Sequence, residues 1–274
     1  METDSVKDSI QNMILDFYSP RPHTTIDVDV KSLERAIAEQ LTKYWGGYVE
    51  SRRSSDSSTI ELRGLLKNAI QRIQTPEFET ADVLLVVLDD CALVNGHAFV
   101  KNGIGIAFYV LKDGYSIAFH RVFAMHEIIH AIHYKLNSTF AFDTSEWQQQ
   151  TSRQLLCEGI ATVFTAIALR ISMKEALWSD ALSHATVDGW MLACESSKGE
   201  LCQQVLDNFD LNAPSGLFQF VPEAVPIANR SGYWLGSLFI YDLLDKGWSA
   251  QEILLAPYSV LSEQLRGWLL GNAD

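Results

Sequence analysis

Two histidines and a glutamate have the types and the spacing needed to hold and use a divalent metal ion. His126 and His130 lie four residues apart in a segment with helical periodicity, so both imidazoles project from one helix face, one turn apart. Neutral imidazole nitrogen is a good zinc ligand, and a catalytic zinc site has three protein ligands and one position open to water. Glu127 follows the first histidine and would take a proton from that water. The spacing therefore predicts one zinc ion and metal-assisted hydrolysis.

The residues around this motif predict that its helix is buried, because apolar side chains surround it on nearly all sides. Buried imidazoles and carboxylates need partners, since an unpaired polar group is costly away from water. A single buried histidine is usually an ordinary core residue, whereas two histidines and a carboxylate in one buried helix favour a metal. The apolar residues are Val122, Phe123, Met125, Ile128, Ile129 and Ile132.

The third ligand has to come from further along the chain, where the candidates are His133, Asp143, Glu146 and Glu158. We choose Glu158, because it lies in the strongly apolar segment 155–164, where an unpaired carboxylate would be unfavourable and coordination to zinc would remove that cost. We expect the neighbouring Gly159 to let this second helix approach the first closely. The alternative is a salt bridge from Glu158 to Arg121 or Arg153.

Composition limits the partners of the chain. Its 274 residues are 47% hydrophobic, which is enough for a sizeable core. Lys and Arg number 21 against 34 for Asp and Glu, so the net charge of -13 disfavours binding to nucleic acid and to anionic membranes. The first residues lack the basic start and apolar stretch of an export signal. Apolar runs are shorter than the roughly 18 to 20 residues of a membrane span. We expect a cytoplasmic protein, or one that leaves the cell by a non-classical route.

The four cysteines, Cys91, Cys157, Cys194 and Cys202, contain no C-x-x-C pair, so they form no recognisable zinc or redox motif. Buried free thiols are the expected state. A disulfide between Cys194 and Cys202 is the alternative.

Periodicity predicts helices over residues 5–18, 32–48 and 62–73, so the N-terminal segment 1–78 is expected to be largely helical. A strand is predicted over 81–89, followed by a hairpin or a short meander formed by 96–100, a turn at 101–103, and 104–110. Gly103 and Gly105 indicate a bulge or a close backbone approach in the last strand. If that strand lies at the edge of the sheet beside the site, it can bind an extended peptide.

The remainder is predicted to be helical over six ranges: 120–136, 149–170, 173–190, 199–208, 231–246 and 258–269. The clearest loop is 212–229. The overall class is a mostly helical α+β fold in which a small sheet precedes the zinc-binding helix. Because no linker or repeat is visible, we predict one domain over 1–274, with a helical N-terminal segment at 1–78, a sheet and zinc helix at 79–136 and a helical C-terminal segment at 137–274.

A resemblance to a known family rests on His126-Glu127-x-x-His130 followed by Glu158-Gly159-x-Ala161. This pair resembles the gluzincin clan of zinc metallopeptidases, which includes thermolysin and the aminopeptidases. Within the clan the chain looks most similar to the bacterial family of predicted zinc-dependent proteases, over roughly residues 80–255. A later Gly232-Tyr233-x-x-Gly236 segment also fits that family. The metzincin pattern does not fit, because His133 and Leu136 stand where that class has glycine and a third histidine.

The resemblance implies a zincin-like fold in which the substrate lies antiparallel to an edge strand, expected here at 103–109, with Gly103 and Gly105 as substrate-binding residues. It also implies a side chain that stabilises the developing oxyanion. Tyr233 is the candidate, with Arg230 and His120 as the alternatives; Arg230 is also expected to contact the substrate. The chain departs from the thermolysin pattern at Thr162, where an acidic residue would orient a metal-binding histidine. That role would fall to Asp143, Asp180 or a backbone carbonyl.

These expectations describe a zinc metallopeptidase that acts on peptide or protein substrates, with no nucleic-acid or membrane partner. Two alternatives share the same metal site. One is a zinc-binding interaction domain without proteolytic activity, and the other is a specialised metalloenzyme for a single small-molecule or modified-peptide substrate. Substrate specificity depends on loops whose position relative to the metal site cannot be predicted from the sequence pattern. The oligomeric state is also left open.

Overall fold

The computed structural model describes residues 14–18, 83–89, 96–101, 103–111, 115–141, 149–214, 216–219 and 229–273. The chain divides into two compact units, Met1–Lys135 and Leu136–Asp274. Most of the described residues are helical, and a small sheet precedes the helix that carries His126, so the expected mostly helical α+β class is confirmed. The division into two compact units does not test whether 1–274 is a single domain, so the single domain stays a prediction.

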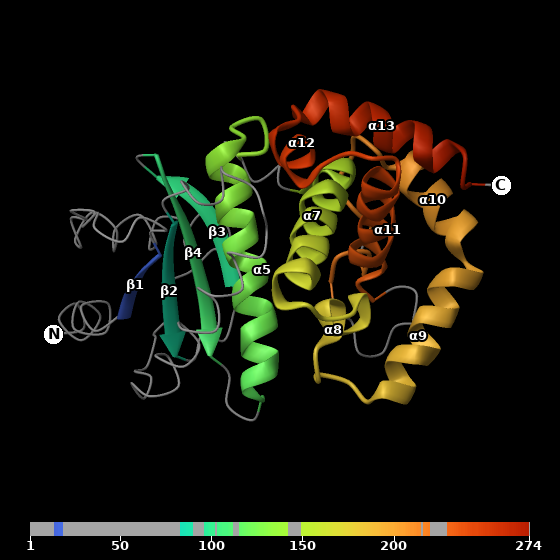
Figure 1. Ribbon diagram of the computed structural model, residues 1–274. Coiled ribbons are helices and arrows are strands. Elements are labelled where there is room, and N and C mark those ends of the chain that lie inside the picture. Colours follow the sequence, from blue (N-terminus) through green and yellow to red (C-terminus); the bar gives the residue numbers. More distant parts are fainter. Residues whose placement is uncertain are drawn as a thin grey trace, which may run out of the picture. The chain divides into compact units, whose positions relative to one another are not determined.

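The first unit contains a four-stranded mixed sheet with the order β1-β2-β4-β3 (Figure 1). Strand β2 (Val83–Asp89) runs parallel to β4 (Ile104–Leu111) and antiparallel to β1 (Ile14–Tyr18), while β3 (Gly96–Lys101) pairs antiparallel with β4. The predicted strand at 81–89 and the predicted hairpin at 96–110 are therefore confirmed. The hairpin turns at Gly103, whose φ of 77° is readily adopted by glycine.

The predicted helix at 5–18 is wrong over its last five residues, which form β1. The segment ILDFY pairs in register with β2, with Asp16 opposite Leu85. Isoleucine, phenylalanine and tyrosine favour strands, and ladder pairing with β2 outweighs a weak helical spacing. Residues 5–13 and the predicted helices at 32–48 and 62–73 lie outside the described residues.

The expected edge strand is also corrected. Strand β4 pairs with β2 on one side and with β3 on the other, so both of its hydrogen-bonding edges are occupied. A peptide cannot be added to the sheet along 103–109, so the strand position on which this expectation rested is wrong. The substrate-binding role of Gly103 and Gly105 stays a prediction. Among the described strands, the edge on this side of the sheet is β3.

Helix α5 (Ile117–Leu136) covers the sheet beside β3 and β4 (Figure 1). The Ser116 hydroxyl accepts a hydrogen bond from the Phe119 backbone N–H at 3.1 Å, which satisfies one free donor at the start of the helix. Its central residues are fully buried, including Ala124, Met125 and Ile129 at 0% exposure. The predicted burial of this helix is therefore confirmed.

The described part of the second unit is mainly helical. Its elements are α7 (Thr151–Leu169), α8 (Met173–Trp178), α9 (His184–Ser196), α10 (Lys198–Asp207), α11 (Ser231–Asp245), α12 (Ala250–Leu255) and α13 (Tyr258–Leu270). The predicted helix at 173–190 is two helices, because Ser183 caps a new helix by accepting a hydrogen bond from the Thr186 N–H. Helix α12 was not predicted, and it begins with a capping box formed by Ser249 and Glu252.

Helices α7 and α11 lie side by side (Figure 1) and approach through two glycines. A Cβ added at Gly159 would lie 2.5 Å from the carbonyl carbon of Gly236, and one added at Gly236 would lie 2.3 Å from the carbonyl oxygen of Leu155. The expectation for Gly159 is corrected: the close approach that it allows is to α11.

Two indole rings pack together at one end of this unit. The rings of Trp178 and Trp190 lie 5.1 Å apart at 84°, an edge-to-face arrangement, and Trp190 Nε1 donates to the Asn229 carbonyl at 2.8 Å. Both side chains are buried, as is Trp234.

None of the described helices combines the length and the hydrophobicity that a membrane span requires.

Candidate metal centre

The two histidines of α5 face each other through their Nε2 atoms. These nitrogens lie 3.1 Å apart, and the ring planes are nearly perpendicular at 83°. Two nitrogens bound to one tetrahedral zinc ion at about 2.0 to 2.1 Å would lie roughly 3.3 Å apart. The side chains are 7% (His126) and 5% (His130) exposed, so the pair is largely shielded from water. The spacing of the two nitrogens therefore fits a shared zinc ion.

A carboxylate completes the group. Among the described residues, His126, His130 and Glu158 each offer a ligand atom, and these atoms all lie within 4.8 Å of one another. Glu158 is half-buried on α7. Two imidazoles and one carboxylate form a recurrent ligand set of catalytic zinc sites. The three residues fit a metal ion, as the sequence predicted.

Of the other candidates for the third ligand, His133 is described and is not part of this group. His133 lies one turn beyond His130 and is fully buried. Burial, and secondly the charge of His130, lower the pKa of His133 to about 3, so this imidazole is neutral at physiological pH. Asp143 and Glu146 lie outside the described residues.

Tyr134 is a site residue that the sequence analysis missed. Its hydroxyl lies 3.2 Å from Nδ1 of His130, and the two rings stack at 24°. A hydrogen bond at Nδ1 fixes the orientation of the ring and leaves Nε2 to face the metal position. Tyr134 follows His130 by one helical turn, and this spacing on a buried helix is the signal that would have found it. Asp180, one of the expected partners, is exposed after α8.

The side chain of Glu127 packs against the start of strand β3. A Cβ added at Gly96 would lie 2.6 Å from Cγ of Glu127 and 2.9 Å from Oε1. Nearby, the Tyr109 hydroxyl and Nδ1 of His120 lie 2.6 Å apart. Burial and then the negative charge of Glu127 raise the pKa of Tyr109, so its hydroxyl keeps its proton. Glu127 thus lies near the buried side chains of Tyr109 and His120 and next to His126 in the sequence.

The candidates for oxyanion stabilisation are held by local contacts. Arg230 precedes α11 in a left-handed conformation, with φ 54°, and its Nη1 donates to the Leu177 carbonyl at 2.9 Å. Its guanidinium lies over the rings of Tyr233, at 4.3 Å, and Trp178, at 5.2 Å. His120 contacts Tyr109 as described above. The structure brings Arg230 and Tyr233 together, and their roles toward a substrate stay predictions.

Arg153, the salt-bridge partner in the alternative interpretation of Glu158, has several contacts of its own. Its Nη1 donates to the Thr139 carbonyl at 2.7 Å, and its guanidinium lies 4.0 Å from the centre of the Tyr258 ring. The residue is 6% exposed. These contacts tie the start of α7 to the residues that precede it and to α13.

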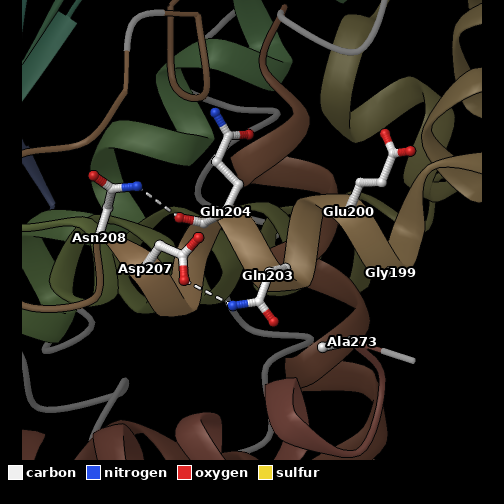
Figure 2. Close-up of a pocket in the computed structure, with 7 residues that line it drawn as sticks. All are labelled: Gly199, Glu200, Gln203, Gln204, Asp207, Asn208 and Ala273. Atoms are coloured by element: carbon white, nitrogen blue, oxygen red, sulfur yellow. Dashed lines mark hydrogen bonds between the residues drawn. The ribbon is translucent and has the colours of Figure 1, made fainter.

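A separate hollow of about 480 Å³ lies along α10 (Figure 2). Its described lining is Gly199, Glu200, Gln203, Gln204, Asp207, Asn208 and Ala273. Gln203 donates to Asp207 at 2.7 Å, and Asn208 donates to the Gln204 carbonyl at 2.9 Å. This lining contains no histidine, no cysteine and no buried carboxylate, so the hollow offers no metal-binding or nucleophilic group.

Cys157, Cys194 and Cys202 are buried and form no disulfide, which confirms the expected thiols and excludes the disulfide alternative in this structure. Cys91 lies outside the described residues.

Comparison with known proteins finds no relative of the chain. No family model matches it, and neither curated proteins nor solved structures give a significant match.

Proposed function

We propose that the chain is a zinc-dependent hydrolase that cleaves peptide bonds, with His126, His130 and Glu158 as metal ligands and Glu127 as general base. The observation that carries the proposal is the group of two imidazoles and one carboxylate within 4.8 Å, with Glu127 next to the first imidazole on α5. Further support comes from the His-Glu-x-x-His and Glu-Gly-x-Ala segments, which resemble those of the gluzincin peptidases.

Each residue has a distinct task in this proposal. Zinc, when bound, supplies Lewis-acid chemistry that polarises a carbonyl group and makes water a stronger acid near neutral pH. Glu127 accepts a proton from the attacking water and returns it to the leaving amine. Tyr134 holds His130 in orientation through Nδ1. Tyr233, or alternatively Arg230 or His120, stabilises the negative charge that develops on the carbonyl oxygen.

The ligand set is tested by measuring zinc content after dialysis. The parent protein should keep about one zinc ion per chain, and His126→Ala and Glu158→Ala should each lose most of it, because an open site with two protein ligands holds zinc weakly. His184→Ala, which removes an exposed imidazole at the start of α9, is the matched control and should keep the metal. A ligand variant that binds zinc as tightly as the parent would remove that residue from the set.

The general base is tested with Glu127→Gln, which keeps the shape of the side chain and removes its basicity. We expect unchanged zinc content and a fall in kcat of about 10² to 10⁴-fold. The assay follows cleavage of a diverse peptide library by mass spectrometry, with and without a chelator. Glu200→Gln, on the exposed face of α10, should behave as the parent.

Two results of this assay would contradict the proposal. Equal turnover by Glu127→Gln and the parent would remove Glu127 as the base. A zinc-loaded parent that cleaves no peptide in the library would contradict peptidase activity and leave a metal-binding role or a specialised substrate.

A further inference from the structure

Gly96 is the first residue of β3 and lies opposite Tyr109 in the β3–β4 ladder. Residues that are paired across an antiparallel ladder point to the same face of a sheet. Tyr109 points toward α5, where its hydroxyl meets His120. The face of β3 that lacks a side chain at Gly96 is therefore the face that α5 covers.

Small residues continue along this face. Ala98 lies two residues after Gly96 and pairs with Ala107, and these alanines are 3% and 0% exposed. Because alternate residues of a strand share a face, Gly96, Ala98 and Ala107 together form a shallow surface against which a helix can pack closely. His97, on the opposite face, stacks on Phe99 instead, with ring centroids 6.2 Å apart.

The space above Gly96 is occupied by the carboxylate side chain of Glu127. The three nearest heavy atoms to a Cβ placed at Gly96 are Cγ, Cδ and Oε1 of Glu127, at 2.6, 2.9 and 2.9 Å. Real Cβ atoms essentially never show contacts under 3.0 Å, so a side chain at this position would force the carboxylate to move. The nearest of the three atoms, Cγ, lies midway along the glutamate side chain, and no backbone atom is among these three neighbours.

We propose that Gly96 is a positioning residue for the general base: the missing side chain on strand β3 forms the niche that holds the Glu127 carboxylate beside His126. This inference rests on the proposed function and deepens it. Glycine weakens a strand because it loses more conformational freedom on folding and packs no side chain, and a glycine in a strand often marks a close approach. Here the close approach is that of the catalytic carboxylate.

The steric basis of the proposal is tested by a thermal stability cycle in the presence of a chelator, so that neither metal nor turnover contributes. Gly96→Ala should lower the Tm of the parent by about 5 °C, because an overpacked site strains its neighbours. In a Glu127→Ala background the three clashing atoms are gone, and the same Gly96→Ala change should shift the Tm by less than about 2 °C. Should Gly96→Ala alone fail to fold, a folded Gly96→Ala/Glu127→Ala protein gives the same answer.

The positioning role is tested with zinc-loaded protein. Gly96→Ala should lower kcat by about 10-fold or more, since displacement of a catalytic group by about 1 Å can cost 10²-fold. Its KM should stay within about 2-fold of the parent's, and its zinc content should be unchanged. In a Glu127→Gln background, Gly96→Ala should change the residual turnover by less than about 2-fold, because no base remains to be misplaced. Gly189→Ala, on α9 with nothing within 4 Å of its Cβ, is the matched control.

The outcomes separate this inference from the proposed function. An equal Tm loss in the parent and Glu127→Ala backgrounds, or parental kcat in a folded Gly96→Ala variant, would overturn the role of Gly96 while leaving zinc hydrolysis intact. Full activity of Glu127→Gln would overturn the proposed function, and the stability cycle would then still report whether Gly96 holds that side chain in place.

Discussion

At the residue scale, Tyr134 is hydrogen-bonded to His130, one of the proposed metal ligands. The Tyr134 hydroxyl lies 3.2 Å from Nδ1 of His130, while Nε2 of the same ring faces His126. A metal-binding imidazole whose second nitrogen is hydrogen-bonded is pre-oriented and more basic. Tyr134 is 6% exposed, so water competes little for this hydroxyl.

Removing that hydroxyl should weaken zinc binding without altering the fold. We expect Tyr134→Phe to raise the zinc Kd by about 10-fold, at the low end of the range for such partners, because the ring of His130 loses its orientation. Competition with a chelating dye measures the Kd. Tyr115→Phe, at an exposed tyrosine before α5, should leave the Kd unchanged. Equal affinities for parent and Tyr134→Phe would show that the bond contributes nothing.

Two cysteines should resist modification because they are buried. Burial raises the pKa of the Cys194 thiol to about 12 and that of Cys202 to about 11. The thiolate is the reactive form, so both should react far more slowly than free cysteine with a disulfide reagent at pH 8. The rate of thiol release in native protein and in urea checks this. Immediate reaction of both cysteines in the native protein would contradict their burial.

At the element scale, the pairing of α7 and α11 depends on an absence of side chains. Gly159 and Gly236 bring the two backbones into contact, with Gly236 also facing the Leu155 carbonyl. Helix α7 carries Glu158 next to this contact, so the packing that holds α7 also fixes the segment of the chain from which the carboxylate projects.

A methyl group at this crossing should be destabilising. We expect Gly236→Ala to reduce the free energy of unfolding by about 2 kcal/mol or more, because its Cβ would lie 2.3 Å from a carbonyl oxygen that is fixed in a helix. Gly267→Ala on α13 is the control: nothing lies within 4 Å of its Cβ, and it should stabilise by about 0.5 to 1 kcal/mol through helix propensity. Urea unfolding measures both, and a neutral Gly236→Ala would contradict the contact.

The elements that could be predicted from sequence are those with a strong local pattern. The apolar run of β2, the hairpin around Gly103 and the buried helix α5 follow from periodicity and glycine placement. Strand β1 could not be predicted, because its conformation is decided by pairing with β2, far away in sequence. The edge position of β3 could not be predicted either, because it depends on the order of the strands in the sheet, and local sequence patterns do not determine that order.

The same distinction applies to the candidate site. His126, Glu127 and His130 were visible because their spacing matches one helical turn, and Glu158 because a carboxylate in an apolar segment needs a partner. Gly96 was not visible, since its contact with Glu127 crosses from a strand to a helix. Tyr134 could have been predicted, because it lies one helical turn after His130, but it was missed.

At the scale of the whole molecule, metal binding should contribute to stability by mass action. An ion that binds only the folded state stabilises it by about 2.7 kcal/mol at a free concentration 100 times its Kd. Chelation should therefore lower the Tm of the parent, and it should have no effect on His126→Ala, which lacks a ligand. Differential scanning calorimetry with and without chelator tests this. A parent Tm that is insensitive to both zinc and chelator would contradict specific binding.

The buried indole pair has a consequence for how unfolding can be followed. Of the seven tryptophans, only Trp45 precedes residue 136, so intrinsic fluorescence reports almost entirely on the unit Leu136–Asp274, in which Trp178 and Trp190 contact each other. Circular dichroism averages over both units. Coincident denaturation curves from the two optical signals would mean that the chain melts as one cooperative body, whereas an earlier or later fluorescence change would reveal two thermodynamic domains.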